Sequence, residues 1–186
     1  GNGRWAKEQG QNRIYGHNHG VTAVRNTAEA CAEVGIEYLT LYAFSSENWN
    51  RPQREVNALM DLLIQTIRSE MKTLQDNNIA LSAIGNLEQL PEACHTSLQD
   101  AIQETSSNTG LTLNLALSYS GKSDITRAVQ AIAQQVKNGS VDPESIDDSL
   151  IKRYLTTAKI PDPALLIRTS GETRISNFLL WELAYT

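Results

Sequence analysis

The feature that most constrains the fold is a regular alternation of short apolar runs with longer amphipathic segments. Three of the short runs have the length and composition of buried strands, and they occupy residues 38–44, 79–84 and 111–117. A fourth run, Ala164–Arg168, is similar. Strands that alternate with helices require right-handed crossover connections, which produce a parallel sheet with helices on both faces. We therefore predict an α/β fold with a mostly parallel central sheet.

The amphipathic segments predict the helices and the domain organisation. The expected helices cover residues 19–34, 52–76, 91–106, 124–136 and 142–155, and a further helix begins at Ser176. The 186 residues contain no linker, repeat or low-complexity segment, so we expect a single domain over residues 1–186. A strand before Gly1 would bring the opening segment to the same edge of this sheet as the loops after the other strands.

Composition excludes several classes of protein. The net charge of −5 provides no basic excess for nucleic-acid binding. No apolar run approaches the roughly 20 residues of a membrane span, and no signal peptide is visible. The two cysteines, Cys31 and Cys94, are too far apart to indicate a zinc site or a disulfide scaffold. We expect a cytoplasmic protein.

A nucleotide-binding alternative comes from Ala116–Ser123, which has the spacing of a Walker A loop between a strand and a helix. Only Gly121 supplies backbone freedom there, and the next predicted strand ends in Arg168 rather than in a magnesium-binding aspartate. The simpler interpretation is a turn in which Ser123 caps the following helix.

Three stretches concentrate side chains suited to phosphate. In the opening GNGR, Gly1 and Gly3 would let the backbone of a loop approach a ligand closely. The second stretch, residues 44–52, packs two hydroxyls, a carboxylate, two carboxamides, an indole and a guanidinium between a strand and a helix. In the third, residues 168–177, two arginines flank a glycine turn.

Arginine offers a fork of donors for phosphate oxygens and stays charged, and a helix beginning at Ser176 would also favour an anion. We therefore predict two separate groups of phosphate-binding residues, and hence two phosphorylated substrates or one with two ends. The first group is Arg4, Arg13, His17 and Arg51, and the second is Arg168, Arg174 and Ser176.

These stretches resemble signature segments of the cis-prenyltransferase family. The matching segments are GNGRWA at residues 1–6, RIYGH at 13–17, TLYAFSSENWNRP at 40–52 and IRTSGETRISNFLLWELAY at 167–185. The resemblance implies a transferase of isoprenoid biosynthesis that condenses isopentenyl diphosphate in cis onto an allylic diphosphate such as farnesyl diphosphate. The implied product is undecaprenyl diphosphate, a lipid carrier for peptidoglycan precursors in cell-wall synthesis. The resemblance also implies Mg²⁺, a homodimer, peripheral contact with the membrane and an apolar product channel.

The resemblance assigns roles to individual residues. The allylic diphosphate is held by Gly1, Asn2, Gly3, Arg4, Arg13 and His17, with Arg51 close by. The isopentenyl diphosphate is held by Arg168, Arg174 and Ser176, next to Ile175. Between the two substrates lie Ser45, Ser46, Glu47 and Asn48, of which Asn48 is a proposed proton acceptor. Trp5 and Trp49 would pack against substrate. The channel would be lined by Leu59, Leu62, Leu63 and Ala43.

The sequence also departs from the family pattern. The resemblance places the catalytic aspartate immediately before Gly1 and a metal-binding glutamate after Thr186, so neither is in this sequence. We therefore expect that the sequence is truncated at both ends, that its first strand is missing, and that the 186-residue chain is inactive. Thr173 stands where some members place a histidine near the metal, and Ser118–Lys122 replaces an NYGGR-like turn. A non-catalytic accessory subunit is the main alternative, although such a subunit should lack the diphosphate-binding segments that are present here.

Overall fold

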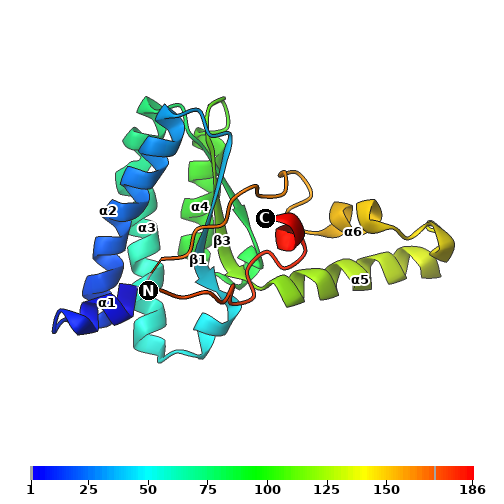
Figure 1. Cartoon of the computed structure of the whole chain (residues 1–186), viewed down its shortest axis with the longest axis horizontal. Helices are drawn as coiled ribbons and strands as arrows, with labels where there is room; N and C mark the ends of the chain where they lie inside the picture. Colours follow the sequence, from blue (N-terminus) through cyan, green and yellow to red (C-terminus); the bar gives the residue numbers. More distant parts are fainter. Residues whose placement is uncertain (1, 170) are drawn as a thin grey trace. The chain divides into compact units, whose positions relative to one another are not determined.

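A three-stranded sheet organises the first part of the chain. Its strands are β1 (Tyr38–Ser45), β2 (Ala80–Ile84) and β3 (Thr112–Tyr119), in the order β1-β3-β2 (Figure 1). β2 and β3 are parallel, with a register that pairs Ala80 with Thr112 and Ile84 with Ala116. The predicted α/β fold with a parallel sheet is confirmed, and so are three of the four predicted strands.

The computed structural model describes residues 2–169 and 171–186. The chain divides into two units, Gly1–Ser118 and Tyr119–Thr186, and each is described by itself. No helix within the described residues is long and apolar enough to cross a membrane.

Four helices belong to the first unit, and they are α1 (Asn2–Glu8), α2 (Arg13–Glu33), α3 (Gln53–Asp76) and α4 (Glu92–Glu104). Short 3₁₀ turns cover Ser46–Asn50 and Leu87–Gln89. α3 buries Val56, Met60, Ile67 and Leu74, which recur at helical spacing on one stripe. This stripe joins α4 and the leucines of β3 in one hydrophobic core, and it confirms the predicted long helix.

Asn2, Gly3 and Arg4 of the opening GNGR segment are helical, so the loop predicted there is wrong; Gly1 lies outside the described residues. α1 lies on α2, where two glycines allow the close approach. A Cβ atom on Gly16 would lie 2.0 Å from the backbone oxygen of Asn2, and one on Gly20 would meet only the Asn2 side chain. α2 itself starts earlier than predicted because Asn12 caps it, accepting a 2.9 Å hydrogen bond from the Tyr15 amide.

The second unit contains α5 (Gly121–Lys137), α6 (Asp148–Tyr154) and 3₁₀ turns at Pro143–Ser145 and Glu182–Tyr185. The helix predicted over residues 142–155 is two pieces, because Asp142 caps the 3₁₀ turn and Asp147 starts α6 as a second cap.

Two further predictions fail in the second unit. Residues 164–168 are not a strand: they have no partner strand among the described residues, and Leu165 and Ile167 are 73% and 76% exposed. The helix predicted from Ser176 is reduced to the turn Glu182–Tyr185. Left-handed backbone at Ser176, Asn177 and Leu179 interrupts helical geometry before that turn.

Candidate active site

Three side chains of the first unit lie around one carboxylate, that of Glu55. Arg13 is the first residue of α2 and His17 lies one turn later, whereas Arg51 and Glu55 flank the start of α3. The Glu55 carboxylate oxygen Oε1 lies 2.8 Å from Nη1 of Arg51 and 3.6 Å from Nε of Arg13. The structure thus brings together three of the four residues predicted for the first group. It adds Glu55, whose position four residues after Arg51 was the signal that sequence reasoning missed.

The surroundings of His17 favour its neutral form. Burial lowers the pKa of its imidazole, the Arg51 and Arg13 guanidiniums lower it further, and Glu55 opposes them. Its Nε2 atom is buried and has no hydrogen-bond partner among the described residues. A neutral imidazole beside two guanidiniums and one carboxylate leaves the group with a net positive charge, which suits an anion.

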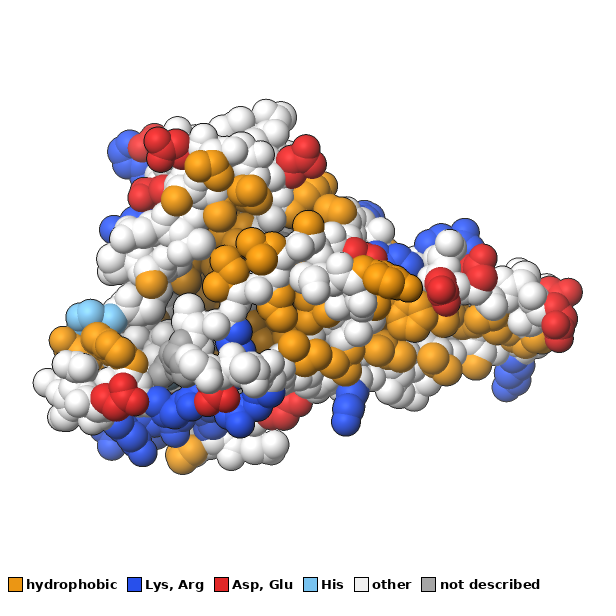
Figure 2. Space-filling view, viewed as in Figure 1, with side chains coloured by type: hydrophobic (Ala, Val, Ile, Leu, Met, Phe, Trp, Pro, Cys, Tyr) orange, Lys and Arg blue, Asp and Glu red, His pale blue; other side chains and the backbone are white. Residues whose placement is uncertain are grey.

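Arg4, the fourth residue of the first group, lies on α1 with Asn2 and Gly3, which the resemblance also assigns to the allylic diphosphate. Gly3 is buried against Arg13, since a Cβ there would lie 2.8 Å from the Arg13 Nε atom. Asn2 and Arg4 are exposed, and Gly1 lies outside the described residues. On the face that Figure 2 shows, Lys and Arg side chains gather over α1 and the first turns of α3.

Trp5 belongs to an exposed aromatic cluster of α1 and α2. Its ring is nearly parallel to that of Tyr15, with centroids 6.2 Å apart, and lies 5.4 Å from His19. Tyr15 and His19 are themselves 4.2 Å apart. The Trp5 side chain is 41% exposed, so it has surface left for contact with a ligand.

The segment after β1 is held by its own hydrogen bonds. The Ser45 amide donates to Oδ1 of Asn48 at 3.2 Å as part of a capping box. Ser46 donates through its hydroxyl to Glu47 at 3.3 Å. Burial, with the Glu47 charge, raises the pKa of Tyr42 to about 12. Asn48 therefore caps the 3₁₀ turn, and its side-chain oxygen already accepts a hydrogen bond.

Trp49 packs into the core of the first unit. Its indole Nε1–H donates to the Ser118 hydroxyl at 2.9 Å, and its ring meets Phe44 edge-on at 4.8 Å. Ser118 in turn donates to Gln89 at 2.7 Å. These contacts fix the turn that leads from β1 to Arg51.

The second predicted group lies on a loop of the second unit. Arg168 donates through Nη1 to the backbone oxygen of Arg174 and, at 2.9 Å, to the Ser176 hydroxyl. The Arg174 guanidinium pairs with Glu172 at 3.3 Å and is largely exposed. Thr173 and Ile175 are part of the same loop, and Ile175 is 37% exposed. The three predicted residues are therefore neighbours.

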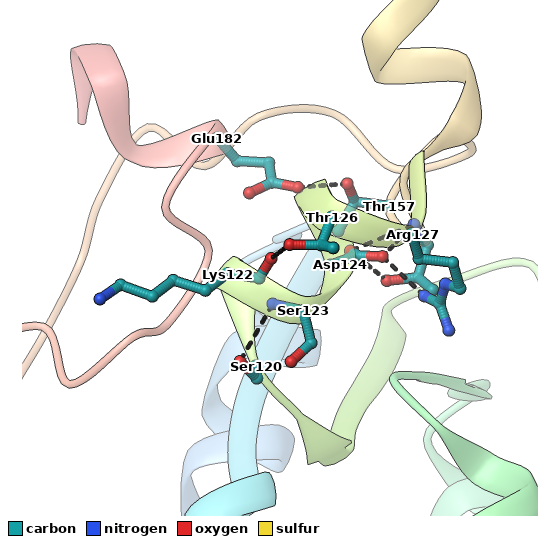
Figure 3. Close-up of polar contacts among 9 residues, drawn as sticks. Ser120, Lys122, Ser123, Asp124, Thr126, Arg127, Thr157 and Glu182 are labelled. Carbon is teal, nitrogen blue, oxygen red and sulfur yellow. Dashed lines mark hydrogen bonds and ion pairs between the residues drawn. The ribbon is translucent and has the colours of Figure 1, made fainter. Parts of the chain in front are cut away.

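The Walker-like segment has a different structure from the one its spacing suggests. Ser120, not Ser123, caps α5, and its hydroxyl accepts from the Ser123 amide at 3.2 Å (Figure 3). The two preceding amides, of Gly121 and Lys122, donate to Asn177. The predicted cap is corrected, and these three amides are not available to cradle a phosphate.

Asp124 is a buried residue that the sequence reasoning overlooked. Its carboxylate accepts from Arg127 at 2.7 Å and from the amide and hydroxyl of Thr156 (Figure 3). In the same view Glu182 accepts from the Thr157 hydroxyl, and its second oxygen Oε2 is buried without a partner among the described residues.

The residues that the structure describes do not by themselves form a magnesium site. Within residues 2–169 and 171–186, no three His, Cys, Asp or Glu side chains converge in a way that could hold a metal ion. Thr173 offers only a hydroxyl at the position that the resemblance places near the metal.

The chain is similar to known proteins over its whole length. A sequence model of the family described as "Putative undecaprenyl diphosphate synthase" matches residues 1–186. An isoprenyl transferase of Chlorobaculum tepidum is 54% identical over 186 residues, which cover all of this chain and 70% of the relative. A ditrans,polycis-undecaprenyl-diphosphate synthase of Vibrio cholerae, described as specific for (2E,6E)-farnesyl diphosphate, is 50% identical over 185 residues. The match covers all of this chain and 74% of the relative.

Two solved structures share the fold. Lavandulyl diphosphate synthase from Lavandula x intermedia, in complex with dimethylallyl diphosphate, matches with a TM-score of 0.93 and 37% identity, over 98% of this chain and 79% of that one. A "probable undecaprenyl diphosphate synthase" from Campylobacter jejuni matches with a TM-score of 0.77 and 31% identity, over 90% of this chain and 78% of that one.

Proposed function

The chain belongs to the undecaprenyl diphosphate synthase family of cis-prenyltransferases, and we propose that it adds isopentenyl diphosphate units in cis to farnesyl diphosphate. The observation that carries this proposal is the convergence of Arg13, His17 and Arg51 on Glu55. Two guanidiniums and a half-buried imidazole with a free nitrogen suit a diphosphate, because charge-assisted hydrogen bonds are the strong ones.

In the proposed reaction each substrate is bound by one group of residues. The first group, with Asn2, Gly3 and Arg4 of α1, binds the allylic diphosphate, and Trp5 contacts its chain. Arg168, Arg174 and Ser176, with Ile175 beside them, bind isopentenyl diphosphate. A carbon–carbon bond forms to the allylic carbon as its diphosphate leaves, and isopentenyl diphosphate loses a proton. The first group stabilises the charge that develops on the leaving diphosphate.

The intervening segment is proposed to orient the reacting ends. Ser45, Ser46 and Glu47 would contact substrate oxygens, and Asn48 would accept or relay the proton. The Asn48 oxygen already accepts from the Ser45 amide, so we propose that it takes up the proton through its second lone pair and passes it to the diphosphate that leaves the allylic substrate. Trp49, which already donates to Ser118, would present only the remaining face of its ring to substrate.

The resemblance implies Mg²⁺ as cofactor, but the described donor set does not fit it. The two carboxylates that the resemblance assigns to the metal are not residues of this sequence. We therefore derive no step of the reaction through a metal.

A hydrocarbon product requires an apolar channel, for which α3 is the proposed wall. Leu59, Leu62 and Leu63 are partly buried on α3, and Ala43 is exposed on β1. We predict that Leu63→Ala lengthens the product and Leu63→Trp shortens it, by changing the space available. Unchanged lengths in both variants would remove Leu63 from the channel.

We further propose that the product is undecaprenyl diphosphate and that it serves as a lipid carrier in cell-wall synthesis. We also propose that the protein is a cytoplasmic homodimer and that residues 1–186 belong to a single domain. The test is product analysis of the full-length protein with Mg²⁺, radiolabelled isopentenyl diphosphate and farnesyl diphosphate, with dimethylallyl diphosphate as a second acceptor. We expect a long polyprenyl product from farnesyl diphosphate. A single condensation on dimethylallyl diphosphate would instead favour a short-chain enzyme, and no product with either acceptor would favour a non-catalytic accessory subunit.

A further inference from the structure

Asn177 lies at the N-terminus of α5 and binds it through three atoms. Its backbone oxygen accepts from the Gly121 amide at 2.8 Å, and its side-chain Oδ1 accepts from the Lys122 amide at 2.9 Å. Its Nδ2 donates to the Ser120 hydroxyl at 2.7 Å. One residue thus satisfies two of the amide donors that a helix leaves free in its first turn and also contacts the helix cap.

The helix is shaped to receive this residue. A Cβ on Gly121 would lie 2.8 Å from Cγ of Leu180 and 3.1 Å from the backbone oxygen of Asn177, so the close approach requires glycine. Phe178 is buried and meets Tyr119 edge-on at 6.2 Å. The left-handed φ of 64° at Asn177 is one that asparagine tolerates better than most residues.

Ser176, the residue before Asn177, belongs to the second group. Ser176 accepts the 2.9 Å hydrogen bond from Arg168, and it too has left-handed backbone, with φ of 52°. Both residues of that pair lie on irregular backbone, so neither a helix nor a strand fixes their separation. The hydrogen bonds of Asn177 with the start of α5 anchor the chain one residue from Ser176, and Arg168 is in turn bonded to Ser176.

We propose that Asn177 is a positioning residue for isopentenyl diphosphate: by occupying the N-terminus of α5 it holds Ser176 and Arg168 in the geometry that binds the diphosphate. This inference rests on the proposed function. At this helix start with Walker-like spacing, the chain itself supplies the acceptors for the Gly121 and Lys122 amides.

The decisive variant is Asn177→Gly in the full-length protein. Glycine keeps the left-handed backbone and the acceptor to Gly121 but removes both side-chain hydrogen bonds, without adding strain. We expect the isopentenyl diphosphate KM to rise about tenfold, the loss of one to two hydrogen bonds, while the farnesyl diphosphate KM stays within about twofold. Asn177→Asp keeps the acceptor for Lys122 and should rescue most of the loss.

Ser123→Ala is the matched control, because Ser123 lies in the same turn and its side chain makes none of these bonds. Calorimetric binding of isopentenyl diphosphate to the same variants gives a readout that needs no turnover. If the wild-type protein binds isopentenyl diphosphate but makes no product, the proposed function fails, and the inference is still decided by the Kd of Asn177→Gly. An unchanged KM and Kd in Asn177→Gly, equal increases for both substrates, or no binding by the wild type would each overturn the inference.

Discussion

The two groups of phosphate-binding residues are built on different kinds of backbone. In the first unit Arg13 and His17 lie on α2, and Arg51 and Glu55 flank the start of α3. In the second unit Arg168, Arg174 and Ser176 all lie on irregular chain. The first group is fixed by secondary structure and shares a carboxylate, whereas the second is fixed by a few hydrogen bonds to its neighbours.

The difference has an energetic consequence. Side chains held by helices lose little further freedom when they bind an anion, so more of their interaction energy appears as affinity. The second group has Ser176 in a left-handed conformation and an exposed Arg174 that pairs with Glu172. It therefore depends on local anchors, and substitutions there should act mainly on substrate binding.

The largest effect is expected when the second group loses a guanidinium. Arg168→Ala removes the contacts to Ser176 and to the Arg174 backbone as well as a cation for the diphosphate. One or two charge-assisted bonds correspond to about 1.5–3 kcal/mol, so the isopentenyl diphosphate KM should rise about 10- to 100-fold. Arg174→Ala should have a similar but smaller effect.

Steady-state kinetics with each substrate varied in turn measures this effect, and Arg153→Ala is the control because Arg153 is an exposed arginine of the same unit, outside the loop. If Arg174→Ala left every kinetic constant intact, the second group would be wrongly assigned.

The first group is predicted to be more sensitive to how its helices pack. Gly16→Ala places a methyl group against the backbone oxygen of Asn2, whereas Gly20→Ala meets only the end of the Asn2 side chain, which can move. We expect Gly16→Ala to lower the free energy of unfolding by about 1–3 kcal/mol and Gly20→Ala to change it much less. Urea unfolding of the two variants decides this, and equal stabilities would show that α1 is not packed tightly on α2.

The sequence predicts regular elements better than it predicts their ends or the loops. The stripe of α3 and the leucines of β3 have clear periodicity, and both elements are confirmed. The position of Arg13 and His17 on one side of α2 is also predictable, since residues four apart share a helix face. The helix Asn2–Glu8 is not predictable in this way, because it packs closely on Gly16 and Gly20 of another helix, and such tertiary packing overrides local propensity.

The failures in the second unit have a similar cause. Residues 164–168 have a strand-like composition, but a strand also needs a partner, and none is present among the described residues. Ser176 and Asn177 look like a helix start, yet Asn177 binds the start of another helix instead. The spacing of Glu55 from Arg51 signals that ion pair, but the second contact of Glu55, with Arg13 of another helix, depends on tertiary structure.

A smaller effect should show whether Trp49 supports the core beside the first group or contacts substrate. Trp49→Phe keeps the ring against Phe44 and removes the hydrogen bond to Ser118. The free energy of unfolding should fall by about 1 kcal/mol, with the KM of both substrates nearly unchanged, if Trp49 serves the core. Thermal or urea unfolding with parallel kinetics measures both quantities. A raised KM at unchanged stability would show that the indole contacts substrate.

The smallest expected effect is a pH dependence that belongs to the first group alone, because the second group has no histidine. The pKa of His17 is lowered from its ordinary value of 6.5 by burial, by Arg51 and by Arg13, against Glu55. As pH falls through 6.5, the unfolded chain takes up a proton at His17 before the folded chain does. Folding stability must therefore decrease as pH falls through this window, until the lower folded pKa is reached.

The variant His17→Gln is neutral at every pH and lacks this contribution. Its free energy of unfolding should decline less than that of the wild type between pH 7.5 and pH 5. Urea unfolding at matched ionic strength measures the difference. Parallel pH profiles for the wild type and His17→Gln would mean that His17 is as readily protonated in the folded chain as in the unfolded one, and the first group would then carry one more positive charge than we infer.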